Sequence, residues 1–118
     1  MGRILIVDDD ADLSQVMAAL IGRMGHTAMH CMSGQEAMQK AEAFRPDVAF
    51  VDLAIPLMNG YKVAVDLRKL CGDKLRLIAM SGLPSHLVKT DGAVFEGFLV
   101  KPVMSHTLVA LIGEVDGA

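Results

Sequence analysis

The sequence predicts an α/β fold in which a doubly wound, five-stranded parallel sheet is covered by five helices. Short apolar runs alternate with segments of helical periodicity along all 118 residues. Such alternation is typical of parallel strands joined by right-handed crossovers. The run at 48–51 (VAFV) contains no polar residue, which indicates a strand buried on both faces. The length suits one domain with a sizeable core, so we expect a single domain over 1–118 and no output domain in this chain.

The first part of the chain predicts a strand, a helix and a weaker strand. The apolar run at 4–7 (ILIV) is the first strand, and 27–31 is the second. Between them an apolar stripe recurs at helical spacing, and Gly25 is the expected stop. The stripe consists of Leu13, Val16, Met17, Leu20, Ile21 and Met24.

The second helix opens with a capping box. Ser33 is followed three residues later by Glu36, and the helix is expected to end before Pro46. The buried strand at 48–51 comes next, and a third helix is expected over 60–70.

The last part of the chain continues the alternation. Strands are expected at 77–80 and 98–100, with a short helix between them that starts near Pro84 and ends by Gly92. The last helix carries a stripe of Leu108, Leu111, Ile112 and Val115.

Composition excludes several classes of protein. The chain is 53% hydrophobic and 21% charged, which argues against disorder. A net charge of -3 makes binding to nucleic acid unlikely. We expect no membrane span, and three aspartates at 8–10 interrupt any signal-peptide core. Cys31 and Cys71 match no metal or redox spacing, so we interpret them as reduced thiols of a cytoplasmic protein.

Polar residues follow four of the five predicted strands. They are Asp8 and Asp9 after the first strand, Asp52 after the third, Ser81 after the fourth and Lys101 after the fifth. The carboxyl ends of parallel strands lie along one edge of the sheet, where ligands bind in open α/β folds. We therefore expect these five side chains to form one site. The second strand is followed by no such polar residue, as expected if it lies at the outer edge. Asp10 is interpreted separately as an acid favoured at the start of a helix.

The predicted site is suited to phosphoryl chemistry. Two carboxylates about 4 Å apart repel each other by about 4 kcal/mol at an effective dielectric of 20, so a cation is expected among them. Oxygen ligands at a wet pocket suit Mg²⁺, for which Mn²⁺ or another divalent cation can substitute. Lys101 can contact a phosphoryl oxygen and Ser81 can donate a hydrogen bond to another. Asp52 can then accept a phosphoryl group as an aspartyl phosphate.

At these residues the chain resembles the receiver domains of two-component response regulators, the CheY-like family. The resemblance is carried by ILIVDDD (4–10), VDLAIPLMNG (51–60), AMSG (79–82) and FLVKP (98–102), in this order. It implies a flavodoxin-like sheet of strand order 2-1-3-4-5. It also implies a phosphoacceptor switch that relays signals by protein contact and is not an enzyme with external substrates.

The resemblance implies a role for each site residue. Asp52 would be the phosphoacceptor, supplied by a histidine kinase or a histidine phosphotransfer protein. The Mg²⁺ ligands would be Asp9, Asp52 and the backbone carbonyl of Ala54, with Asp8 acting mainly through water. The remaining roles are the switch hydroxyl of Ser81, the phosphate contact of Lys101, the aromatic switch at Phe98 and a cis Lys101–Pro102 peptide. Phosphorylation would reshape the face of the fourth helix, fifth strand and fifth helix.

Three alternatives were weighed on the same residues. A haloacid-dehalogenase-type phosphohydrolase needs a general acid two residues after its aspartate, where this chain has Ala54. A receiver-like module that works without phosphate is disfavoured by the complete set of site residues. A dinucleotide or flavin binder needs a phosphate-cradling loop after the first strand, but this loop is acidic and lacks glycine.

Two further expectations concern single residues. Ala54 and Leu83 stand where many receivers have polar groups, so we expect slow self-hydrolysis of the phosphate. His26 and His30 are interpreted as solvated residues of an edge strand. The cognate kinase, the downstream target and the oligomeric state are left open, as is the choice between a stand-alone regulator and part of a larger protein.

Overall fold

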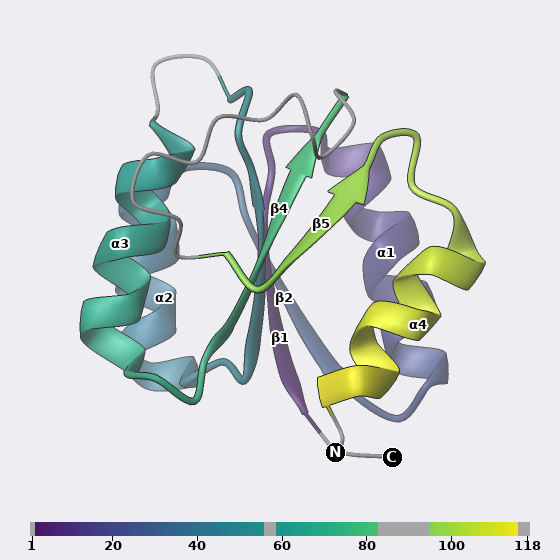
Figure 1. Cartoon of the computed structure of the whole chain (residues 1–118), viewed down its shortest axis with the longest axis horizontal. Coiled ribbons are helices and arrows are strands. Elements are labelled where there is room, and N and C mark those ends of the chain that lie inside the picture. Colours follow the sequence, from purple (N-terminus) through teal and green to yellow (C-terminus); the bar gives the residue numbers. More distant parts are fainter. Residues whose placement is uncertain (1, 56–58, 83–94, 116–118) are drawn as a thin grey trace.

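A computed structural model of the protein describes residues 2–55, 59–82 and 95–115. Figure 1 shows one central sheet with α1 and α4 on one side and α2 and α3 on the other. The five strands are parallel and lie in the order β2-β1-β3-β4-β5. The predicted doubly wound fold is therefore confirmed, including the place of the second strand at the edge.

The strands lie close to their predicted positions. They are β1 (Arg3–Val7), β2 (Thr27–Cys31), β3 (Val48–Asp52), β4 (Arg76–Ser81) and β5 (Gly97–Val100). Asp52 and Ser81 were expected just after their strands and are instead the last strand residues. The ladder continues past the apolar runs because the amide of Leu53 donates to the carbonyl of Met80 at 3.0 Å.

The described helices begin at side-chain caps where the sequence supplies them. They are α1 (Ala11–Arg23), α2 (Gly34–Phe44), α3 (Gly60–Cys71) and α4 (Ser105–Val115). Ser33 Oγ accepts from the Glu36 amide at 3.1 Å, which confirms the predicted start of α2. The Glu36 carboxylate instead pairs with Lys40 at 2.8 Å. The short helix predicted between Pro84 and Gly92 lies outside the described residues.

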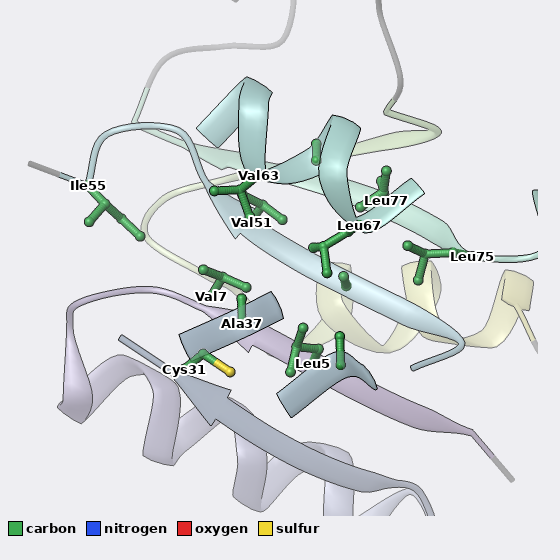
Figure 2. Close-up of a cluster of buried hydrophobic side chains, with 13 residues drawn as sticks. Leu5, Val7, Cys31, Ala37, Val51, Ile55, Val63, Leu67, Leu75 and Leu77 are labelled. Atoms are coloured by element: carbon green, nitrogen blue, oxygen red, sulfur yellow. The ribbon is translucent and has the colours of Figure 1, made fainter. Parts of the chain in front are cut away.

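The alternation of side chains along the strands produces two apolar layers. The layer under α2 and α3 contains Leu5, Val7, Val51 and Leu77 from the sheet and Val63 and Leu67 from α3 (Figure 2). The layer under α1 and α4 contains Ile4, Ile6, Phe50 and Met80, with Met17, Ile21, Leu108 and Ile112 from the helices. The sheet is thus buried on both faces, as the unbroken apolar runs predicted.

One expectation about the core is wrong. Val16, which was assigned to the buried stripe of the first helix, is 58% exposed. The residues of α1 that are fully buried against the sheet are Ser14, Met17 and Ile21. Their spacing of three and four residues defines the buried face, and Val16 lies beside it. The apolar side chain of Val16 was therefore not enough to assign this residue to the buried face.

The two cysteines and His26 also have defined environments. Cys31 is buried in the layer beneath α2, and burial raises the pKa of its thiol to about 11. Cys71 is only partly buried. His26, predicted to be solvated, is only 7% exposed, and its Nδ1 accepts a 2.8 Å hydrogen bond from the Gly2 amide. Among the described residues, no helix is both long and apolar enough to cross a membrane.

Candidate functional site

The pleat of the sheet carries three predicted site residues to one face. Ile4, Ile6, Phe50 and Leu99 all point toward α1 and α4. Because side chains alternate with a period of two, Asp8, Asp52 and Lys101 continue the same face at the carboxyl ends of β1, β3 and β5. The carboxyl edge therefore brings these three charged groups together, as the sequence predicted.

Asp8 is a fully buried carboxylate with two different partners. Its Oδ1 accepts a 2.9 Å hydrogen bond from the amide of Asp10, which tightens the turn from β1 into α1. Its buried Oδ2 lies 2.9 Å from Lys101 Nζ as an ion pair but accepts no aligned hydrogen bond from a described residue. Burial raises the pKa of Asp8, and Asp52 adds to this, while the Asp10 amide and Lys101 oppose it.

Asp52 is held at the end of β3 and is only 4% exposed. Its Oδ1 accepts from the amide of Ala54 at 2.9 Å, and its Oδ2 lies 2.7 Å from Lys101 Nζ. The start of α3 packs tightly against this strand end, because a Cβ built on Gly60 would lie 2.9 Å from the Asp52 carbonyl oxygen. Glycine is therefore required at position 60 for this close approach.

Lys101 places one ammonium group between two carboxylates. Its backbone amide donates to the carbonyl of Ser81 at 2.8 Å, and the Lys101–Pro102 peptide is cis, as the resemblance implied. Burial alone would lower the pKa of Lys101. The contacts with Asp52 and Asp8 outweigh that effect and raise the pKa above its usual value. Lys101 is therefore charged at neutral pH and neutralises part of the acidic site.

Asp9 completes a group of three acids with room for a cation. One oxygen from each of Asp8, Asp9 and Asp52 lies within 4.8 Å of the others. Three carboxylates against one ammonium leave excess negative charge, and Oδ2 of Asp8 is buried without an aligned donor among the described residues. An all-oxygen donor set that includes an exposed carboxylate suits Mg²⁺, which keeps several waters. The residues present therefore fit a magnesium ion.

Ser81 and Phe98 lie on the neighbouring strands β4 and β5. Ser81 is half-buried at the last position of β4, one residue beyond Met80, which pairs with Asp52 across the sheet. Phe98 lies on β5, where its ring centroid is 6.4 Å from that of Phe95. Phe95 in turn makes an edge-to-face contact with Tyr61 of α3 at 6.1 Å. Phe98 is thus part of an aromatic group beside α3 rather than part of the acidic cluster.

The outer strand contributes a residue that the sequence reasoning missed. His30 Nε2 lies 2.8 Å from the backbone carbonyl oxygen of Asp8. His30 lies on the edge strand, as expected, but its interpretation as a solvated residue is wrong because it is half-buried and makes this contact. The position of His30 one residue before the end of a strand adjacent to β1 was the available signal. It could not be used without knowing the register Ile6↔His30.

The chain is matched by the model of a known protein family. The response regulator receiver domain family matches residues 4–113 of the chain. The chain belongs to this family. Receiver domains are the signalling switches of two-component systems and are generally not enzymes in the usual sense. Response regulators receive phosphate from sensor histidine kinases, and the family binds Mg²⁺ at acidic residues of the kind grouped here.

Curated relatives include receiver proteins of different sizes. This receiver domain is 27% identical to the chemotaxis protein CheY of Thermotoga maritima, with 97% of each chain covered. It is 29% identical to the transcriptional regulatory protein PrrA of Mycobacterium leprae, but it spans 48% of that protein. It spans 19% of the sensor histidine kinase AtsR of Burkholderia thailandensis, at 26% identity. Receivers of this kind thus occur both alone and within longer chains.

Solved structures share the fold over nearly the whole receiver domain. The chemotaxis protein CheY4 of Vibrio cholerae superposes with a TM-score of 0.88 at 26% identity, with 98% of each chain covered. A CheY-like receiver domain from Methylobacillus flagellatus gives 0.86 at 27% identity, also with 98% of each chain covered. The flavodoxin-like architecture is therefore shared with known receiver domains.

Proposed function

We propose that this receiver domain is a phosphoacceptor switch in which Asp52 takes a phosphoryl group from a phosphohistidine. The observation that carries the proposal is the position of Asp52, whose Oδ2 meets the Lys101 ammonium at 2.7 Å beside two further carboxylates. The donor would be a histidine kinase or a histidine phosphotransfer protein, and the single domain would span residues 1–118. The cytoplasmic location expected from the sequence stays a prediction.

In this proposal the chain's own residues orient the acceptor. The Ala54 amide holds Oδ1 of Asp52 at 2.9 Å, so the carboxylate has a fixed orientation at the mouth of the site. A carboxylate oxygen of Asp52 attacks phosphorus, the phosphorus–nitrogen bond of the donor breaks, and the imidazole leaves with that electron pair. Lys101 is already charged and within reach, so it can transfer its contact from the carboxylate to a phosphoryl oxygen.

Three acids and one carbonyl would hold the metal. We assign Asp9, Asp52 and the Ala54 carbonyl as direct ligands of Mg²⁺ and Asp8 as a ligand acting mainly through water. When bound, Mg²⁺ supplies charge neutralisation for the transferring phosphoryl group. Ala54 offers no side-chain acid to protonate a leaving group, which supports a switch over a hydrolase of external substrates.

The output would be a change of surface at β5 and α4, which is the fifth helix of the sequence prediction. The predicted fourth helix, which belongs to the same proposed face, lies outside the described residues. We propose that Ser81 donates its hydroxyl to the phosphoryl group and that Phe98 changes its packing. The loop after β4, which was expected to move inward with Ser81, lies outside the described residues. Phe98 is half-buried against Phe95 at the edge strand of the sheet. A rotation of the Phe98 side chain would therefore alter the surface that a partner protein contacts. A local charge change would thus bias a two-state element.

Intact mass spectrometry after incubation with acetyl phosphate tests the proposal. We expect one phosphoryl adduct that requires Mg²⁺, is absent from Asp52→Asn, and persists in Asp66→Asn, a surface control on α3. If the folded, Mg²⁺-binding protein gives no adduct, a phosphohistidine donor is tried next. Failure with both donors overturns the proposed function.

A further inference from the structure

We infer that His30 is a positioning residue that fixes the acidic loop of the metal site from the neighbouring strand, an inference that rests on the proposed function. The bond that carries it joins His30 Nε2 to the carbonyl oxygen of Asp8 at 2.8 Å. A carbonyl oxygen can only accept, so Nε2 carries the proton and donates. The imidazole is therefore held in one tautomer by a backbone group of the site.

This side chain replaces a bond that the sheet no longer provides. The ladder between β1 and β2 ends at the pair Val7↔Cys31, and the Asp8 amide still donates to the Cys31 carbonyl at 3.0 Å. Beyond Cys31 the chain leaves the sheet, and Ser33 becomes the cap of α2. The Asp8 carbonyl has thus passed the end of the ladder, and the imidazole of His30 takes the place of the next strand donor. Both backbone groups of Asp8 are held by β2.

The bond orients Asp9 through the planarity of the peptide. The carbonyl of Asp8 and the amide of Asp9 belong to one peptide plane. Fixing this carbonyl therefore also fixes the direction of the backbone at Asp9. Asp9 is exposed, whereas Asp8 and Asp52 are buried. Of the three acids, the exposed one depends most on its backbone to stay within 4.8 Å of the others. His30 thus controls how well the three oxygens converge.

The backbone of His30 is itself held by α2. Lys40 of α2 donates from Nζ to the backbone carbonyl of His30 at 3.0 Å, and the same ammonium pairs with Glu36 at 2.8 Å. The carbonyl of an edge strand is otherwise left to solvent. The contact from Lys40 limits movement of the strand segment that carries His30.

Mg²⁺ titration by calorimetry tests the inference, since the chain has no tryptophan for fluorescence. A net hydrogen bond corresponds to a factor of about 2 to 10 in an equilibrium constant, so we expect His30→Leu to weaken Mg²⁺ binding by that factor. We expect His30→Gln, whose amide can also donate, to stay within about twofold of the parent. His106→Leu, a change at an exposed position on α4, should leave the affinity unchanged. Circular dichroism and thermal melts establish that each variant is folded.

Nitrogen-15 NMR of the parent provides a readout that a purely structural role would not share. We expect the Nε2–H tautomer at His30 and, on adding Mg²⁺, shift changes of that nitrogen larger than those at His106. Equal Mg²⁺ affinity in all variants, equal losses in His30→Leu and His30→Gln, or an Nδ1–H tautomer would each overturn the inference alone. Parent protein that binds no Mg²⁺ would overturn the inference together with the proposed function. A parent that binds Mg²⁺ but is never phosphorylated would overturn the proposed function and leave the metal-binding role of His30 intact.

Discussion

Lys101 Nζ lies 2.7 Å from Oδ2 of Asp52, and these residues are 49 positions apart in the sequence. The strand β4 separates β5 from β3 in the sheet, so the lysine reaches across a whole strand end to make this contact. The same ammonium lies 2.9 Å from Oδ2 of Asp8 at the end of β1. One flexible cation thus connects three strand ends and balances part of a charge cluster that has room for Mg²⁺.

The Lys101 ammonium reduces the repulsion between the carboxylates of Asp8 and Asp52, so replacing this lysine should destabilise the domain. We expect Lys101→Met to lower the free energy of unfolding by about 1–3 kcal/mol without Mg²⁺, because two buried carboxylates lose their counter-ion. This loss of unfolding free energy is at the lower end for a buried ion pair, because the lysine side chain is 26% exposed. Urea denaturation at neutral pH measures the loss. Mg²⁺ should restore part of it by mass action, and Lys74→Met, an exposed control, should change neither value.

The ionised Asp8 carboxylate lowers the stability of the metal-free protein. The pKa of Asp8 is raised first by burial and then by the charge of Asp52, so ionisation destabilises the fold relative to the unfolded chain. We expect metal-free Asp8→Asn to be more stable than the parent at neutral pH and to bind Mg²⁺ more weakly. The gain in free energy of unfolding of Asp8→Asn over the parent should be absent below 3.8, the ordinary pKa of the Asp8 carboxyl. It should grow as pH rises from there through the raised pKa of Asp8 in the folded protein, and stay level at higher pH. Denaturation curves from pH 3 to pH 8 test this, and an advantage that grows toward low pH would contradict it.

Gly60 is required by the contact between α3 and the strand that carries Asp52. A Cβ at this position would lie 2.9 Å from the Asp52 carbonyl oxygen and 3.1 Å from Leu53 Cα. We expect Gly60→Ala to destabilise the domain by about 1–3 kcal/mol, since backbone must move to admit the methyl group, and to reduce phosphorylation of Asp52. Gly22→Ala is the matched control. Its Cβ would meet nothing within 4 Å, so this change in a helix should stabilise by up to about 1 kcal/mol.

The lifetime of the proposed phosphoryl group depends on Ala54. This residue is exposed beside Asp52, and its methyl group cannot orient an attacking water. We expect the isolated phosphoprotein to lose its phosphate over minutes or longer, and Ala54→Asn, which adds a hydrogen-bonding group, to shorten the half-life. Loss of the adduct mass with time measures both rates. A half-life of seconds in the parent would contradict the expectation. Leu83, predicted to act with Ala54, lies outside the described residues.

The predictions that succeeded rest on local signals. Unbroken apolar runs and helical stripes identify strands and helices without knowledge of the tertiary fold. The carboxylates and the lysine were found because each follows an apolar run, and the topology of a parallel sheet brings such positions to one edge. Ser33 was predicted as a cap because its hydroxyl satisfies a free amide within its own turn.

The predictions that failed depend on contacts between distant segments. The position of His30 at the Asp8 carbonyl follows from the register of β1 against β2, and one sequence does not specify a register between two short strands. His26 is buried and accepts a hydrogen bond from the Gly2 amide, and no pattern near residue 26 indicates that partner. Val16 was misplaced because the width of a buried helical stripe is decided by the neighbouring sheet and helices.

The most direct test is to locate the phosphoryl group chemically. Protein treated with acetyl phosphate and Mg²⁺ is reduced with borohydride, which converts an aspartyl phosphate to homoserine, and the peptides are sequenced by mass spectrometry. The proposed function predicts homoserine at position 52, dependent on Mg²⁺, with Asp8 and Asp9 unchanged. Homoserine at another aspartate, or a phosphoryl group found only on a histidine, would contradict the assignment of Asp52 as the phosphoacceptor.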